Sequence, residues 1–191
     1  MTRWPRSAGS RCSDEDALVP ATVGAAAGDG VRVGSSIRVR APLDQVWEFV
    51  SEPERLISFM SGVTRWEVEG EQRTGLGARY RILFRVGAAE IGGLIEIVEW
   101  DEPRELAWTS VMGIDQRGRW RLRELPGGRT RVELRMAYGV AGSGPWGWVA
   151  ERVAAPAVAG HLRRSLAQLR RMIEHEQLRA RAAARRAARA A

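Results

Sequence analysis

Lysine and asparagine are absent from this chain, and cysteine occurs once, as Cys12. A single cysteine cannot form a disulfide within the chain, which fits a reducing compartment. Without lysine there is no phosphate-binding loop of the G-x-x-x-x-G-K-S/T type. The two histidines, His161 and His175, and the lack of clustered carboxylates leave no recognisable metal site. We therefore expect neither a metal nor a cofactor.

Long apolar runs are also missing. No stretch of about 18 apolar residues occurs, so the sequence predicts no membrane span. Asp14, Glu15 and Asp16 interrupt the region where a signal peptide needs its apolar core. We therefore expect a cytoplasmic protein. With 191 residues, of which 45% are hydrophobic and 28% charged, the chain suits one globular domain with tails.

The basic residues are unevenly placed. All 30 are arginine, a bias typical of GC-rich genomes, so abundant arginine is weak evidence for nucleic-acid binding. Residues 1–160 carry equal numbers of acidic and basic side chains. Residues 161–191 hold nine arginines and two glutamates, which accounts for the whole net charge of +7.

Three segments differ in pattern. Residues 1–30 are rich in Gly, Ala, Ser and Asp without steady periodicity, which predicts a disordered leader. Residues 31–176 carry the periodic patterns of a folded domain. In residues 177–191 the apolar stripe stops, and this segment is a basic Ala/Arg tail.

Within the folded domain, alternation of apolar and polar residues predicts strands. The first spans 31–40, and Pro42 then starts a short helix that is followed by a second one ending near Ser58. Gly92-Gly93 indicates a bulge or bend, and Gly113–Gly118 a turn. The further strands are expected at 63–70, 79–86, 90–100, 105–112, 119–124 and 130–138.

A long helix closes the domain. Its N-cap is predicted at Ser143, and Pro156 should kink it or divide it. Its apolar stripe has the spacing 4, 3 and 4, and comprises Leu162, Leu166, Leu169 and Ile173. Together the patterns predict an α+β fold. A curved antiparallel seven-stranded sheet is wrapped around the C-terminal helix, with two short helices after strand 1 and a cavity between sheet and helix.

Several segments agree with one superfamily in order and spacing: APLDQVWEFVSEPERL at 41–56, EIVEWDEPRELAW at 96–108, GRWRLRELPGGRTRVELRMAYG at 118–139 and the closing helix from 145. They resemble the START-like (SRPBCC) superfamily, and within it the polyketide cyclase/dehydrase and lipid-transport branch, over about residues 35–175. The resemblance implies a helix-grip fold with a cavity for a hydrophobic ligand. That superfamily includes lipid carriers, aromatic polyketide cyclases, ubiquinone-binding proteins and co-chaperone-like modules, so the resemblance leaves the function open.

Aromatic and apolar side chains on the inward-facing strand positions and first helix are candidates for the cavity wall. With this fold we expect the ligand to contact Trp47, Phe59, Tyr80, Phe84, Trp108, Trp120, Met136 and Tyr138. The alternative is that these side chains only pack the core.

Three residues are candidates for proton transfer. Tyr138 could polarise a ketone, but it could also be an ordinary core tyrosine. Glu96 and Glu99 lie at opposite parity in one strand, so one should point inward and have a raised pKa, unless strand curvature or the bulge at Gly92-Gly93 lets both reach solvent. His161 could act as a base, or lie at the edge of the apolar stripe.

Three functions follow from these features. The first is binding or carriage of a hydrophobic small molecule, such as a lipid, quinone or polyketide-like compound, in the cavity. The second is a polyketide cyclase or aromatase that uses the same cavity. The third is a protein or nucleic-acid interaction module that acts through the basic tail, which could hold nucleic acid or an anionic membrane. The alternative is that the tail is a solvated helix end or a frayed tail. The sequence leaves the oligomeric state open.

Overall fold

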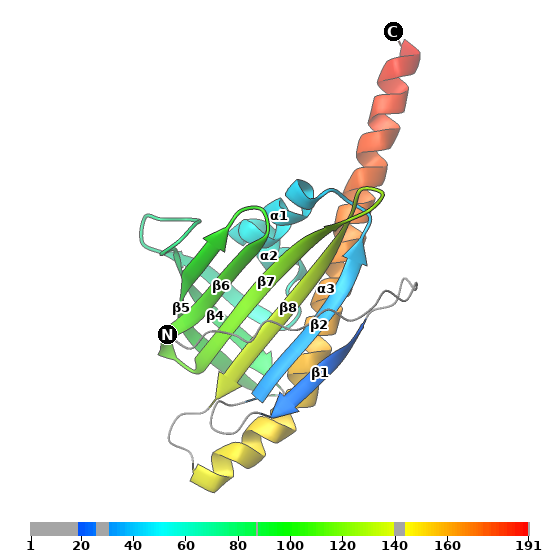
Figure 1. Ribbon diagram of the computed structural model, residues 1–191. Coiled ribbons are helices and arrows are strands. Elements are labelled where there is room, and N and C mark those ends of the chain that lie inside the picture. The colour runs from blue at the N-terminus through cyan, green and yellow to red at the C-terminus, as the bar shows by residue number, and fades with distance from the viewer. Residues whose placement is uncertain (1–18, 26–30, 87, 140–143, 191) are drawn as a thin grey trace.

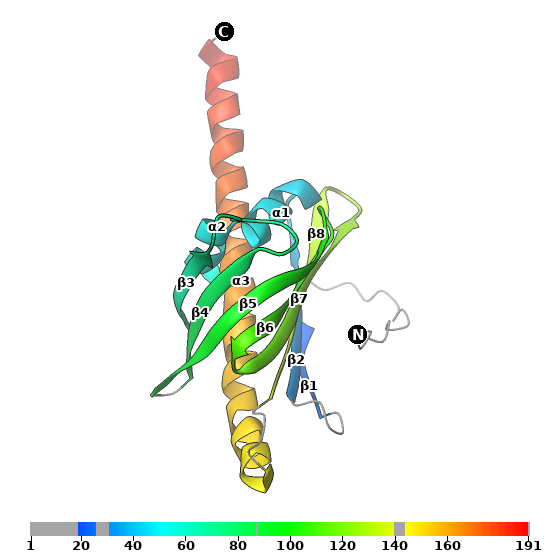
Figure 2. The same ribbon diagram turned by 90° about the vertical axis from the view of Figure 1, so that its left-hand side faces the viewer.

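Eight antiparallel strands form one sheet in this computed structural model, which describes residues 19–25, 31–86, 88–139 and 144–190. The strand order is β1-β2-β8-β7-β6-β5-β4-β3, so β2 and β8 lie side by side although nearly the whole domain separates them in sequence. The sheet curves around the long helix α3 (Figures 1 and 2). The predicted α+β helix-grip fold is confirmed.

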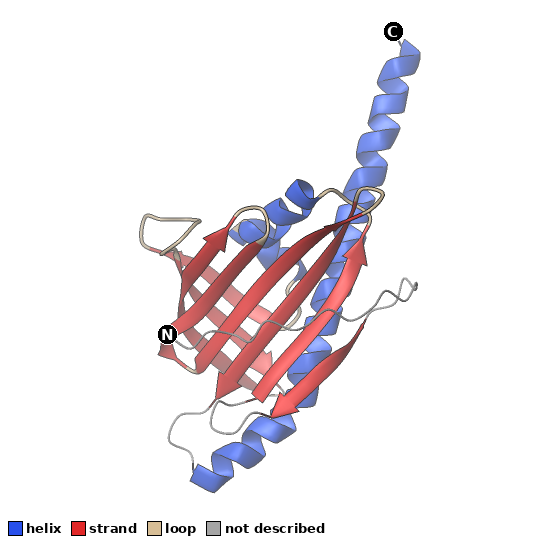
Figure 3. Ribbon diagram, viewed as in Figure 1, coloured by secondary structure: helices blue, strands red, loops and turns tan. Residues whose placement is uncertain are grey.

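The elements follow one another in a simple order, and Figure 3 shows how strands and helices are distributed. In chain order they are β1 (Val19–Ala25), β2 (Val31–Val39), α1 (Leu43–Ser51), α2 (Pro53–Phe59), β3 (Val63–Glu69), β4 (Arg79–Val86), β5 (Ala89–Asp101), β6 (Glu105–Gly113), β7 (Asp115–Leu125), β8 (Arg129–Gly139) and α3 (Gly144–Ala190).

All seven predicted strands are present, as β2 to β8. One boundary prediction was wrong, because the residues expected to form a turn at Gly113–Gly118 mostly belong to β7. The turn is much tighter than expected. Gly113 adopts a φ of 96°, and the N–H of Ile114 bonds the carbonyl of Gly92 at 3.3 Å. A glycine at this φ lets the chain reverse within two residues.

Strand β1 was not expected, since it lies within the segment predicted to be a disordered leader. It pairs antiparallel with β2 along the edge of the sheet. Pro20 lies where the register between the two strands shifts, and an edge strand tolerates a proline because the missing N–H is not needed by a second neighbour. Cys12 and the acidic cluster near it lie outside the described residues.

The two short helices lie over one end of the curved sheet (Figure 2). The carbonyl of Pro42 accepts the first helical bond of α1 from Val46 at 3.2 Å. Pro53 starts α2, where a missing N–H has no cost. Both helices turn their apolar faces inward, and the buried residues are Val46, Trp47, Phe49 and Val50 in α1 and Pro53, Leu56 and Phe59 in α2.

Helix α3 fills the concave face of the sheet. Its predicted apolar stripe is confirmed, since Leu162, Leu166, Leu169 and Ile173 are all at least 97% buried. Pro156 lies inside one continuous helix rather than between two. Figure 1 shows the first turns, in yellow, inclined to the orange part that follows, as a proline without an N–H donor predicts. Ser143, the expected N-cap, lies outside the described residues.

At Gly92 and Gly93 the backbone of β5 lies very close to the backbones of both neighbouring strands. A Cβ on Gly92 would collide with the carbonyl oxygen of Ile82, and one on Gly93 with that of Met112. Only glycine permits this backbone approach. The register between β5 and β6 shifts twice just beyond these residues, so β5 is bulged as well as bent.

Candidate functional site: an aromatic cavity under the short helices

The described residues enclose a cavity between α1–α2 and the concave face of β3 to β7. Its volume is about 20 Å³, enough for one water molecule. None of the residues lining it belongs to α3, so this cavity lies beside the expected position between sheet and C-terminal helix. The lining residues are Val50, Ser51, Pro53, Leu56, Trp66, Tyr80, Ile95, Ile97, Trp100, Leu106, Trp108 and Trp120.

Two hydrogen-bond donors in the wall are unpaired. The indole N–H groups of Trp66 and Trp108 are buried, and neither has an acceptor among the described protein atoms. A buried donor without a partner costs about 1–3 kcal/mol, so each such group calls for an explanation. Both rings line the same cavity. A molecule whose acceptor atoms reach these N–H groups from the cavity would supply the missing partners.

Trp108 is held in place by a glycine on the next strand. Trp108 of β6 lies opposite Gly118 of β7, and a Cβ on Gly118 would collide with Cε2, Cζ2 and Cη2 of the indole. The indole therefore lies directly over the β7 backbone. This packing leaves Trp108 only 6% exposed and fixes its position in the wall.

Ring contacts join the wall to the helices behind it. Trp66 and Tyr80 lie with ring centroids 5.4 Å apart on neighbouring strands. Trp100 meets the edge of Trp47 from α1 at 5.1 Å. Similarly, Phe59 of α2 contacts the ring of Trp120 edge-on at 6.0 Å. Such edge contacts are favourable for aromatic rings. The wall is thus apolar and well packed except at the two unpaired N–H groups.

Tyr80 contributes a hydroxyl that is already engaged. It donates to the carbonyl of Arg73 at 2.5 Å and thereby ties the loop after β3 to the wall. Burial, together with the nearby charge of Glu52, raises the pKa of Tyr80 to about 12, although the charge of Arg73 opposes this. The phenol therefore stays protonated at neutral pH and acts as a donor.

Three of the eight expected ligand contacts line this cavity: Tyr80, Trp108 and Trp120. Trp47 and Phe59 are buried behind it and pack against its wall. Met136 is buried in the core, and Phe84 and Tyr138 are half-buried against that core. For these last three the structure shows core packing and no place in the described cavity wall.

Glu96 and Glu99 of β5 both lie on the outer face of the sheet. Glu96 accepts a hydrogen bond from Nε of Arg79 at 2.7 Å, and Glu99 from Nη2 of Arg119 at 2.5 Å. The register shift between Ile97 and Glu99 explains this, because one bulged residue, Val98, reverses the parity of the strand. Both carboxylates therefore reach solvent, as the alternative expected, but through the bulge at Val98 rather than the one expected at Gly92-Gly93. Neither faces the cavity.

His161 lies on α3 against the turn between α2 and β3. Its Nδ1 is 3.1 Å from Oγ of Ser61 and 3.1 Å from Nη2 of Arg164. Burial and the charge of Arg164 hold the pKa of this imidazole below its ordinary value, outweighing a hydrogen bond from the ring to the backbone of Ser61. The ring packs over Gly62, which has a φ of 85°. His161 therefore joins α3 to the turn between α2 and β3, and it does not line the described cavity.

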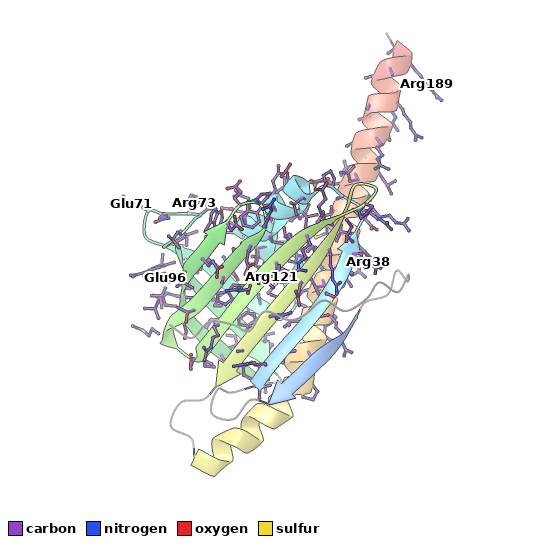
Figure 4. All side chains as sticks on the ribbon, viewed as in Figure 1. Arg38, Glu71, Arg73, Glu96, Arg121 and Arg189 are labelled. Carbon is purple, nitrogen blue, oxygen red and sulfur yellow. The ribbon has the colours of Figure 1, made fainter. Side chains whose placement is uncertain are left out.

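The three candidates for proton transfer are not brought together. Tyr138 is on β8, opposite Val31 of β2 and Gln116 of β7. Glu96 points outward from β5 (Figure 4), and His161 is on α3. The structure thus assembles no shared acid–base site from these three residues.

Sequence reasoning did not select several lining residues. Ser51 and Pro53 occupy the break between the two short helices, where no periodicity marks an inward face. Trp100 lies beyond the bulge in β5, so its inward orientation contradicts the simple alternation. Trp66 has the right parity on β3, and its tryptophan identity was the one available signal.

A curved antiparallel sheet that grips a C-terminal helix defines a helix-grip protein. Residues 30–174 match the family described as polyketide cyclase / dehydrase and lipid transport, and the chain belongs to this family. No curated protein sequence matches the chain.

Solved structures share the fold at low sequence identity. A protein from Thermus thermophilus is 20% identical with a TM-score of 0.66, and the match covers 76% of this chain and 98% of that one. The ZhuI aromatase/cyclase from Streptomyces sp. R1128 is also 20% identical, with a TM-score of 0.63 and coverage of 75% and 93%. At this identity the similarity establishes the fold alone.

Proposed function

We propose that the protein binds a hydrophobic small molecule, such as a lipid, quinone or polyketide-like compound, under helices α1 and α2. The observation that carries this proposal is the pair of buried, unpaired indole donors, Trp66 and Trp108, in an otherwise apolar wall. A ligand with carbonyl or ether oxygens on an apolar frame satisfies both features. The family and the shared fold support the same class of ligand.

Ligand binding must enlarge the cavity. The present volume of about 20 Å³ compares with about 300–1,000 Å³ for ordinary small-molecule sites. Helices α1 and α2, which cover the cavity, are the part suited to move, because they have only nine and seven residues. Outside the core, α2 is held to α3 by exposed contacts: Arg55 with Glu176 at 3.4 Å and the Ser58 carbonyl with Gln168 at 2.9 Å.

The energy available from such binding is substantial. Burying about 200 Å² of ligand apolar surface contributes about 5 kcal/mol before ordering costs. Satisfying each indole N–H adds about 1–3 kcal/mol relative to leaving it unpaired. Together these terms can offset the displacement of two short helices.

Binding or carriage is favoured over cyclisation by the chemistry of the wall. Among the described lining residues, Tyr80 is the only one with an ionisable side chain. Its hydroxyl is committed to the carbonyl of Arg73, and its pKa is raised to about 12. A cyclase needs a group that exchanges a proton with its substrate near neutral pH. The cyclase alternative therefore depends on the two indole donors polarising a carbonyl without such a partner.

The direct test is gentle purification of the full chain, organic extraction and mass spectrometry of the co-purifying compounds. We expect an apolar compound with oxygen acceptors at near-stoichiometric amounts. Turnover of a poly-β-ketone probe by the purified protein would instead establish the cyclase. If nothing co-purifies and neither a fatty acid nor a quinone probe alters the tryptophan fluorescence, the proposal fails.

A matched pair of variants locates the site. Trp108→Phe removes one unpaired donor and keeps an aromatic ring in the wall, so we expect ligand affinity to fall about 5- to 150-fold. Trp47→Phe is the control, because Trp47 is equally buried but does not line the cavity. Equal losses of affinity in both variants would place the ligand elsewhere.

A further inference from the structure

Charge is segregated across the sheet, although residues 1–160 together have no net charge. The neighbouring strands β2, β8 and β7 contain nine arginines and three acidic residues. Strands β6, β5, β4 and β3 contain four arginines and seven acidic residues. One half of the sheet is therefore strongly basic and the other acidic. Strand β2 joins the basic half through the fold, because it pairs with β8 although the two strands lie far apart in the sequence.

Three arginines form a row across the basic half. Arg38 of β2 lies directly opposite Arg131 of β8, and Arg131 lies opposite Arg123 of β7. All three belong to the outer face, since their neighbours Val39, Val132 and Leu122 are buried on the inner one. The row spans about 10 Å, two strand spacings. Like charges directly opposite each other repel, so the row concentrates positive charge on this part of the outer face, and Arg131 also donates to Oγ of Ser36 at 3.5 Å.

A second set of arginines extends along the end of α3. Residues 178–190 are helical and exposed at every position, and they project beyond the sheet (Figure 1). Five arginines and no acidic residue occur there: Arg179, Arg181, Arg185, Arg186 and Arg189. Three of them follow a spacing of four and share one face, with alanines opposite. A cation interacts favourably with the helix dipole only within the last turn. Most of these arginines lie before that turn and do not stabilise the helix in this way.

The row and the helix end lie at the same end of the molecule. Strand β2 reaches α3 there, since the backbone N–H of Arg40 donates to Glu174 at 3.2 Å. Figure 4 shows Arg38 close to the point where α3 leaves the sheet, and Arg189 near the tip of the helix. The row of Arg38, Arg123 and Arg131 together with the five arginines of the helix end is called the basic surface below.

We propose that the basic surface binds the phosphate backbone of a nucleic-acid duplex without reading its sequence. The duplex carries one charge per about 1.7 Å of axis, which suits guanidinium groups spread along a rigid helix about 20 Å long. The helix end has no aromatic side chains to stack on single-stranded bases. Its opposite face is alanine with one exposed leucine, Leu178, too little apolar surface for a lipid interface.

The test is fluorescence anisotropy of the full chain with a labelled DNA duplex of random sequence, about three helical turns long, at several salt concentrations. Five to eight contacts predict a slope of log K against log salt of about −4.5 to −7. Truncation after Gln177 removes only exposed residues, and we expect it to weaken binding more than tenfold and make the slope shallower by about 4.5. The double variant Arg123→Gln with Arg131→Gln should make the slope of log K against log salt shallower by about 2.

The control removes equal charge from the acidic half. Arg65→Gln with Arg85→Gln lowers the net charge by the same two units, and both side chains pair with glutamates, Glu67 and Glu90. This variant should bind DNA as the parent does. The proposal is overturned if the control loses as much affinity as the Arg123/Arg131 variant, if truncation leaves binding unchanged, or if the chain binds phosphatidylserine vesicles in preference to DNA.

Discussion

Gly118 of β7 lies directly beneath the indole of Trp108 on the neighbouring strand, where any Cβ would collide with the ring. The position of the Trp108 indole, whose N–H group is one of the two unpaired donors, therefore depends on Gly118, a residue without a side chain. The wall of the cavity thus depends on this pair of residues.

We predict that Gly118→Ala destabilises the protein by about 1–3 kcal/mol, because the indole must move within a packed wall. Urea unfolding measures this loss. Gly34→Ala is the matched control in another strand, since a Cβ there would lie 3.4 Å from Cγ of Arg135, an ordinary contact with a flexible side chain. Equal stability of the two variants would show that Trp108 is not held by Gly118.

Among the elements, α3 and the turn after α2 are joined by a small polar cluster. Oγ of Ser165 accepts from the N–H of Ser61 at 2.8 Å and donates to the carbonyl of His161 at 2.8 Å. Nδ1 of His161 lies within 3.1 Å of the guanidinium of Arg164, so it accepts there and carries no proton. The contact thus requires a neutral imidazole.

This requirement predicts a pH dependence of stability. The pKa of His161 is lowered in the folded protein, so between about pH 7.5 and 5.5 the unfolded chain takes up a proton first and the free energy of unfolding falls. The effect should be below about 1 kcal/mol, because the site is partly exposed. Urea unfolding of His161→Gln should show a shallower pH slope, with His175→Gln as the control at an exposed histidine. An unchanged slope in His161→Gln would contradict this assignment.

The sequence predicted most elements because their periodicity is clean. Strand β8 and the stripe of α3 alternate or repeat without interruption, and both were placed within one or two residues. The lining of the cavity was harder to predict. The bulge at Val98 turns Glu99 outward and Trp100 inward, and a bulge is set by the neighbouring strand rather than by local composition. Strand β1 was missed because its residues are small and interrupted by Pro20.

Across the whole molecule, the basic and acidic halves of the sheet meet at Glu105 of β6. Its carboxylate accepts two bonds from Arg121, at 2.9 and 3.1 Å, and also pairs with Arg119. The hydrogen bond to Glu105 is the main reason that the pKa of Arg121 is raised. Figure 4 shows Arg121 in the middle of the outer face. Glu105 therefore links the two halves of opposite charge.

We predict that Glu105→Gln costs about 1–3 kcal/mol of stability, because two guanidinium groups that are only 17% and 22% exposed lose a charged acceptor. Chemical denaturation measures this cost. Glu67→Gln is the control, since Glu67 pairs with Arg65 at 3.6 Å with both side chains more than half exposed, and it should change stability by less than about 0.5 kcal/mol. A loss of similar size in the control would refute the special position of Glu105.

The adjacency of β2 and β8 also sets the order in which the protein can form on the ribosome. Strand β2 cannot pair with β8 until residue 139 has been synthesised, and the helix that covers the concave face of the sheet is made last. Pairing between distant parts of a chain is slow, and nascent chains expose their apolar faces meanwhile. Any premature stop before Ile173 leaves the interior of the sheet uncovered, so incomplete chains should be substrates for chaperones or aggregate.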